Sequence, residues 1–138
     1  MSYLLDTNVV SEIRRKAPHP SVIRWFSSIP ESELFLSVLV IGEIRRGIER
    51  LARRDSAQAE VFERWLNQLI TVYEDRIVPI TADVADAWGR LNVPDPVPVV
   101  DGLLAATALV RGWTLVTRNT ADVASTGVRL FDPFKAAG

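Results

Sequence analysis

Cysteine is absent from the sequence, which excludes both a disulfide framework and a metal site built on thiolates. The single histidine, His19, lies between two prolines and is expected in a loop. A zinc site made of several imidazoles is therefore excluded as well. Any metal ion that this protein binds must be held mainly by oxygen atoms.

Long hydrophobic runs are also missing, since no apolar stretch approaches the ~18 residues needed to cross a bilayer. The first residues carry no positive charge, and Asp6 interrupts the first apolar stretch, so a secretory signal is not expected. We expect a cytoplasmic protein that makes no use of a membrane.

Lysine is scarce: fourteen arginines accompany only Lys16 and Lys135, and the net charge is −1. This charge argues against a broad electrostatic coating of nucleic acid. Arginine binds phosphate and carboxylate groups through paired hydrogen bonds. The excess of arginine fits a local anion site or an acidic partner, although a compositional bias of the surface explains it equally well.

The remaining composition is that of an ordinary globular protein, with 48% hydrophobic and 24% charged residues. The length of 138 residues predicts one domain, spanning 1–138. A chain of this size buries roughly two-thirds of the surface of its unfolded state, which is enough for a real core.

Short apolar runs alternate with segments whose apolar residues recur at helical spacing, and these patterns predict strands and helices respectively. The prolines between Asn92 and Val99 predict a rigid loop, and 118–127 is predicted to be a polar loop. This alternation predicts an α/β fold with a short, mostly parallel sheet and helices on both faces. Strands are expected at 3–5, 34–37, 77–80, 113–117 and 128–131, and helices at about 9–16, 20–28, 38–54, 56–74, 81–91 and 101–111.

Asp6 comes directly after the first predicted strand. Open α/β sheets bind ligands in a crevice beyond the carboxyl ends of their strands, so a carboxylate at this place is well located for function. Capping the next helix is an equally good interpretation of Asp6 taken alone, and Thr7 and Asn8 also offer capping side chains.

Two further acids belong to predicted helices. Glu43 lies at the margin of an apolar stripe, one turn before Gly47, and the missing side chain of this glycine lets other groups come close to the helix. The alternative interpretation is that Glu43 forms a solvent-exposed ion pair with Arg46. Asp101 begins a helix that is otherwise apolar and rich in small residues, hence deeply packed. A helix-dipole role is the alternative for Asp101, but a charge at the mouth of a buried helix favours a functional role.

A fourth acid, Asp122, follows the predicted strand that ends at Thr117. A simple turn role is its alternative, because aspartate is frequent in loops. Asn119 in the same loop, like Asn8, could orient a carboxylate or a bound water by hydrogen bonding.

All four carboxylates are expected at one edge of the sheet. Strand ends carry Asp6 and the loop from Thr117 to Asp122 there, and helix starts or early turns carry Glu43 and Asp101. Carboxylates gathered in one cleft repel each other unless cations neutralise them. With oxygen ligands alone, the expected metal is Mg²⁺ or Mn²⁺. Two such ions about 4 Å apart can activate water and stabilise the leaving oxygen of a phosphodiester.

Four segments of the chain carry these acids and their polar neighbours: Leu4-Leu5-Asp6-Thr7-Asn8, Gly42-Glu43-Ile44-Arg45-Arg46-Gly47-Ile48, Asp101-Gly102-Leu103-Leu104-Ala105-Ala106-Thr107-Ala108 and Leu115-Val116-Thr117-Arg118-Asn119. In this order and spacing they resemble the PIN-domain toxins of bacterial toxin–antitoxin pairs, the VapC group and especially its FitB-like branch. Asp132-Pro133-Phe134 is similar to the closing segment of that family.

The resemblance implies a PIN-like three-layer α/β/α fold and a Mg²⁺- or Mn²⁺-dependent endoribonuclease. It also implies a homodimer and a cognate antitoxin that blocks the cleft. By resemblance, the catalytic and metal-binding residues are Asp6, Glu43, Asp101 and Asp122, and the supporting polar residues are Thr7, Asn8, Thr117 and Asn119. The chain departs from the family pattern after Asp122, where Val123 replaces the usual aromatic residue.

Two other functions remain open from the sequence. One is a catalytically silent PIN-like module that only binds its partner, and the other is a metal-dependent DNA nuclease, because no feature of the sequence recognises a 2′-hydroxyl. A phosphotransferase of the haloacid-dehalogenase type is excluded, since it would need a second aspartate where Asn8 stands and a lysine in the cleft.

Overall fold

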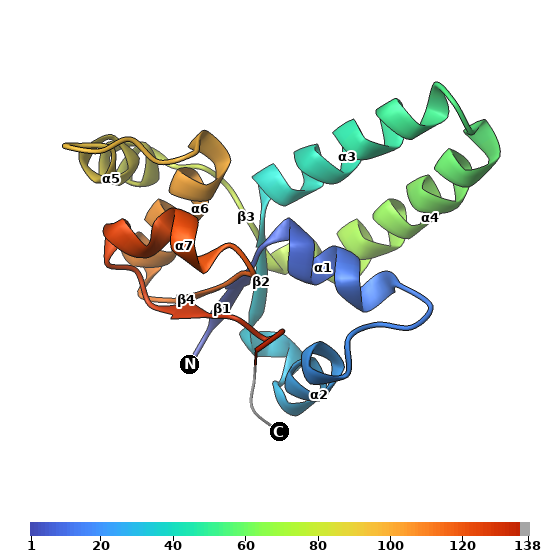
Figure 1. Ribbon diagram of the computed structural model, residues 1–138, viewed down its shortest axis with the longest axis horizontal. Helices are drawn as coiled ribbons and strands as arrows, with labels where there is room; N and C mark the ends of the chain where they lie inside the picture. The colour runs from blue at the N-terminus through green and yellow to red at the C-terminus, as the bar shows by residue number, and fades with distance from the viewer. Residues whose placement is uncertain (136–138) are drawn as a thin grey trace.

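A sheet of five parallel strands lies at the centre of the molecule, seen in a computed structural model that describes residues 1–135 (Figure 1). The strand order is β3-β2-β1-β4-β5, so the first strand in the chain is the central one. This confirms the predicted α/β class with a parallel sheet. The strands are β1 (Tyr3–Leu5), β2 (Leu34–Ser37), β3 (Ile77–Val78), β4 (Thr114–Val116) and β5 (Leu130–Phe131).

Helices cover the sheet on both sides: Figure 1 shows α1 to α4 on one side of β1 and β2, and α5 to α7 on the other. The long helices α3 and α4 pack against each other as an antiparallel hairpin, and α5 packs against α6. The helices are α1 (Thr7–Arg14), α2 (Pro20–Ser28), α3 (Val38–Ala52), α4 (Ser56–Val72), α5 (Ala82–Leu91), α6 (Val99–Arg111) and α7 (Thr120–Val123), with 3₁₀ turns at Glu31–Glu33, Glu74–Arg76 and Ala124–Thr126.

The core forms around the central strand, where Leu4 and Leu5 are fully buried. Burying a leucine side chain contributes roughly 1.5–3 kcal/mol, so both residues fix β1 firmly between its neighbours. Helix α6 approaches this core with small residues, because Ala105, Ala106 and Ala108 are also fully buried. None of the helices in residues 1–135 is long and apolar enough to cross a membrane.

Three strands are shorter than predicted. The strand expected at 77–80 ends at Val78, before Pro79, and it lies at the edge of the sheet as its proline suggested. The strand expected at 113–117 covers Thr114–Val116, and the one expected at 128–131 covers only Leu130–Phe131. Pairing with a neighbouring strand, rather than apolar content, decides where each of these strands ends.

The predicted polar loop at 118–127 was wrong in part, since it contains the short helix α7 and a 3₁₀ turn. Helix α6 begins at Val99, two residues before its predicted start, so that Asp101 lies inside its first turn. The N-cap of α1 is Asp6, not Thr7 or Asn8. His19 was expected in a loop and is the N-cap of α2, where its Nδ1 accepts a hydrogen bond from the Ser21 N–H at 3.2 Å.

Candidate functional site at the carboxyl end of β1

The end of β1 is the point where the direction of the chain through the sheet reverses. From β1 the chain builds β2 and β3 on one side, and it later adds β4 and β5 on the other. A crevice forms at such a point in open parallel sheets. Asp6 is the first residue beyond β1, and its backbone N–H still donates to the Val116 carbonyl of β4 at 2.9 Å. The chain topology therefore delivers Asp6 to this crevice.

The Asp6 carboxylate is almost fully buried, with 5% of the residue exposed, and is held by three donors. Oδ1 accepts from the Thr7 N–H at 2.7 Å, and Oδ2 accepts from Thr117 Oγ1 at 2.7 Å and Asn8 Nδ2 at 3.1 Å. Burial raises the pKa of Asp6, the bonds from Thr117 and Thr7 lower it, and nearby Glu43 raises it, with a net shift upward. Asp6 thus caps α1 and also belongs to a group of interacting acids.

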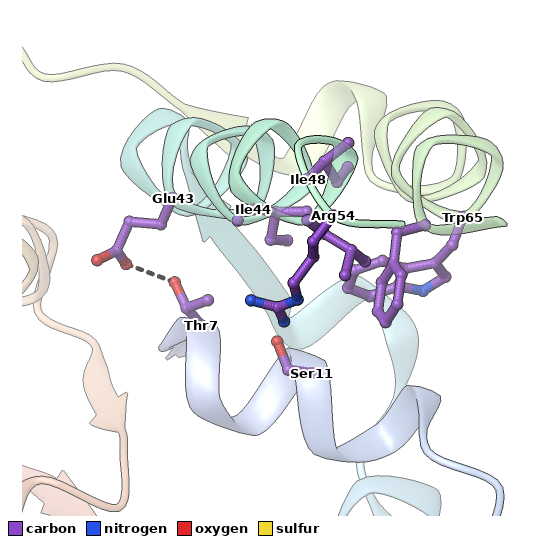
Figure 2. A pocket seen from close by; sticks show the side chains of 10 residues that line it. Thr7, Ser11, Glu43, Ile44, Ile48, Arg54 and Trp65 are labelled. Carbon is purple, nitrogen blue, oxygen red and sulfur yellow. Dashed lines mark hydrogen bonds between the residues drawn. The ribbon is translucent and has the colours of Figure 1, made fainter. Parts of the chain in front are cut away.

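Glu43 reaches the same crevice from α3, the helix that follows β2. Ser37 caps that helix through a hydrogen bond from the Leu39 N–H to its Oγ at 3.1 Å. The Glu43 Oε1 atom accepts a hydrogen bond of 2.6 Å from Thr7 Oγ1, as Figure 2 shows. Among the ion pairs of residues 1–135 there is none between Glu43 and Arg46, so the alternative of a solvated pair is not observed.

Asp101 comes from the first turn of α6, on the opposite side of the crevice. The N-cap residue of α6 is Pro98, which supplies no side-chain hydrogen bond to the helix. The pKa of Asp101 is raised to about 6, first by burial and then by the negative charges of Asp6, Asp122 and Glu43. The other three predicted acids therefore lie within electrostatic reach of Asp101.

Asp122 is the most exposed of these acids and lies in α7. Its backbone N–H donates to the Asn119 carbonyl at 3.2 Å. Asn119 was expected to orient a carboxylate or a water through its side chain. That side chain makes no capping hydrogen bond to α7, and the backbone N–H of Asn119 donates to Thr117 Oγ1 at 3.0 Å. Asn8 does fulfil its expected role, because it bonds Asp6 and also accepts from the Arg118 N–H at 3.2 Å.

The donor set fits a hard divalent cation by its chemistry, because every candidate ligand is a carboxylate oxygen. The negative charges of Asp6, Asp122 and Glu43 repel that of Asp101, and a bound cation would relieve this repulsion. Within residues 1–135, however, no three acidic or histidine side chains converge closely enough to form a set of metal ligands in the side-chain positions seen here. Glu43 and Asp6 are instead satisfied by hydroxyl and amide donors.

A groove of about 270 Å³ starts beside Glu43 and runs between α1, α3 and α4 (Figure 2). No pattern in the sequence indicates this groove. Ile44 and Ile48 of the α3 stripe line it, together with the aromatic rings of Phe62 and Trp65 from α4. Ile44 and Ile48 are also almost fully buried, and Phe62 and Trp65 pack against the core beside them. Since the stripe faces partly into the groove, spacing alone could not separate core from groove.

Comparisons with known proteins agree with this fold. The chain is 29% identical to the toxin FitB of Neisseria gonorrhoeae over 136 residues, covering 95% of this chain and 97% of the toxin. It is 25% identical to a VapC ribonuclease of Sinorhizobium fredii over 140 residues, covering 97% and 99% of the two chains. The crystal structure of FitAcB from N. gonorrhoeae superposes with a TM-score of 0.88 at 29% identity, covering 96% of this chain and 99% of that one.

The family model described as "PIN domain" matches residues 3–125, which include all four acids of the crevice. The resemblance found in the sequence is therefore confirmed, and the chain belongs to the PIN-domain family.

Proposed function

We propose that this protein is a metal-dependent endoribonuclease toxin that hydrolyses RNA phosphodiesters and is inhibited by a cognate antitoxin. The observation that carries the proposal is the geometry at the carboxyl end of β1, where Thr7 joins the buried Asp6 to Glu43 and the charges of Asp6, Asp122 and Glu43 act on Asp101. Similarity to a VapC ribonuclease and to the toxin FitB supports RNA as the substrate. We further infer a cytoplasmic location, in keeping with that substrate.

Asp6, Glu43, Asp101 and Asp122 are the residues that would hold Mg²⁺ or Mn²⁺. When bound, such ions supply Lewis acidity, lower the pKa of a coordinated water and stabilise the leaving oxygen. The chain's own contribution is to hold the acids in place: Thr117 and Asn8 fix one oxygen of Asp6.

Thr7 links two sides of the site, because its N–H donates to Asp6 and its hydroxyl donates to Glu43. This double contact couples the start of α1 to the middle of α3. The cleft also carries surplus negative charge, which repels the phosphates of RNA unless it is neutralised. We infer that cations serve substrate binding as well as chemistry.

The partner inferred from the relatives is an antitoxin, since solved structures of similar chains are toxin–antitoxin complexes. The acidic cleft would attract an arginine or lysine of that partner. A cation supplied in this way would compete with metal for the carboxylates. We also infer a homodimer, for which Trp25 and Trp65, both only partly buried, could supply contact surface.

The test is cleavage of single-stranded RNA by the purified protein with Mg²⁺ or Mn²⁺, with EDTA, and with EDTA followed by excess metal. We expect cleavage only when free metal is present, and none from Asp6→Asn in any condition. Single-stranded DNA of the same sequence separates a ribonuclease from a DNA nuclease. Cleavage that survives complete chelation would refute the metal-dependent mechanism, and no cleavage of either nucleic acid would favour a silent binding module.

A further inference from the structure

Gly102, the residue after Asp101, is a buried glycine at the contact between α5 and α6. A Cβ atom placed on it would lie 2.7 Å from Val97 Cγ2 and 3.2 Å from both Cδ1 and Nε1 of Trp88. The first distance is too short for real atoms, so something would have to move. The helical Gly42, Gly47 and Gly89 have nothing within 4 Å of the same position. Space, rather than backbone conformation, therefore requires glycine at 102.

The two groups that cover Gly102 are themselves held together by Asn92. Its Nδ2 donates to the Trp88 carbonyl at 2.8 Å, and its Oδ1 accepts from the Val97 N–H at 3.1 Å. The loop that ends at Pro98 is joined to the same place, since the Gly102 N–H donates to the Pro98 carbonyl at 2.8 Å. Asn92 thus connects the end of α5 to the loop that leads into α6.

This contact lies directly behind an acid of the crevice. Asp101 and Gly102 are consecutive residues of the first turn of a helix, and that turn moves as one unit. The Val97 side chain is buried at 8% exposure and cannot retreat into solvent without opening the packing between α5 and α6. A displacement at Gly102 is therefore transmitted to the backbone of Asp101.

We propose that Gly102 is a positioning residue for the Asp101 carboxylate, with Val97, Trp88 and Asn92 setting how closely the start of α6 approaches the crevice. The inference rests on the proposed metal-dependent function of that carboxylate. It assigns a specific task to a glycine and to a loop that do not themselves contact the other acids.

The test compares Gly102→Ala with Gly89→Ala, a matched helical glycine with open space around it. Each protein is measured for Mn²⁺ affinity by calorimetry, for kcat and KM on RNA, and for folding by circular dichroism. Displacing a reacting group by about 1 Å can cost 100-fold in rate, so we expect Gly102→Ala to lose roughly 10- to 100-fold in kcat and to bind Mn²⁺ more weakly, with little change in KM. Gly89→Ala should match the wild type in all three.

Rescue by a second substitution makes the test specific. Val97→Ala removes the Cγ2 atom that the new Cβ would overlap, so Gly102→Ala combined with Val97→Ala should recover Mn²⁺ affinity and kcat toward those of Val97→Ala alone. Because relieving the overlap would restore stability as well, the variants are compared at a temperature at which circular dichroism shows all of them to be fully folded.

A folded Gly102→Ala protein with the Mn²⁺ affinity and kcat of the wild type would overturn the proposal. If Gly102→Ala does not fold, Asn92→Ala decides instead: weaker Mn²⁺ binding by a folded protein supports the proposal, and unchanged binding overturns it. If the wild type neither binds Mn²⁺ nor cleaves RNA, the proposed function fails. In that case, crystal structures of the wild type and Gly102→Ala still decide whether the Asp101 carboxylate moves.

Discussion

Replacing Asp101 by asparagine should stabilise the protein at neutral pH in EDTA while abolishing RNA cleavage. The substitution keeps the shape of the side chain and removes one negative charge from the crevice. Activity should collapse because a proposed metal ligand is lost. Stability should rise because a charge no longer has to be partly buried at this position, and because the remaining carboxylates no longer repel it.

The size of the effect follows from the pKa of Asp101, which is raised from 3.8 to about 6. A shift of about two units corresponds to at most about 3 kcal/mol. Asp101 is partly exposed, so solvent screening reduces this to about 1–1.5 kcal/mol. The helix dipole acts in the opposite direction, favouring a carboxylate in the first turn of α6 by about 0.3–1 kcal/mol. Taking the middle of each range, we expect a net gain of about 0.6 kcal/mol for Asp101→Asn, or ~2–3 °C in melting temperature.

The gain should depend on pH in a defined direction. The folded state holds the Asp101 proton more tightly than the unfolded state, so the wild type is favoured below about pH 4 and loses this contribution as the pH rises through about 6. The difference in unfolding free energy between the two proteins should therefore be small at pH 4 and reach its full value near pH 7.

Urea unfolding in EDTA at several pH values measures this difference directly. Added Mn²⁺ should raise the melting temperature of the wild type more than that of Asp101→Asn, by ligand linkage. A variant that is less stable than the wild type at pH 7 and still cleaves RNA normally would show that Asp101 serves the helix and not the site.

Further predictions concern the neighbours of Asp101 and the partners of the whole chain. Thr117→Val removes the hydroxyl that donates to Asp6 Oδ2 at 2.7 Å, and it should cost about 1.5–3 kcal/mol in unfolding free energy, while Thr117→Ser should restore most of it. Light scattering at micromolar concentration should give the mass of a dimer, and a monomer would remove the proposed assembly. Titration with the cognate antitoxin should suppress Mn²⁺ binding and cleavage together; an inhibited complex with full metal occupancy would place inhibition outside the cleft.

Strand and helix identities were predictable because short continuous apolar runs alternate with segments whose apolar residues recur at helical spacing. Burial of Leu4 and Leu5 on both faces of β1 gives the continuous apolar run that the sequence shows. The short helix α7 was missed because four residues hold too little periodicity to distinguish a helix from a turn. The start of α6 was misplaced because the helix was expected to begin at Asp101, whereas it begins after Pro98 without any side-chain cap.

The four acids of the candidate site were predicted from their positions after strands or in the early turns of helices, and their role as metal ligands stays a prediction. Their hydrogen-bond partners were only partly predictable, since pairing of Thr7 with Glu43 depends on how α1 packs beside α3. The packing of Val97 on Gly102 could not be predicted for the same reason, because a glycine in a helical sequence does not indicate which side chain packs against it. Long-range contacts, rather than residue types, were the missing information.

The hydrogen bond between Thr117 and Asp6 joins residues 111 positions apart in the chain. During synthesis, Asp6, Glu43 and Asp101 are all made before the strand that completes the place of Asp6 in the sheet. Bringing residues so far apart in the chain together costs conformational entropy, and this cost comes before the contacts that offset it, so the step is slow. A chain shortened to end before Thr114 should accordingly be inactive in the RNA cleavage assay although it contains three of the four acids. Nuclease activity should therefore require β4, the strand that completes the sheet beside Asp6.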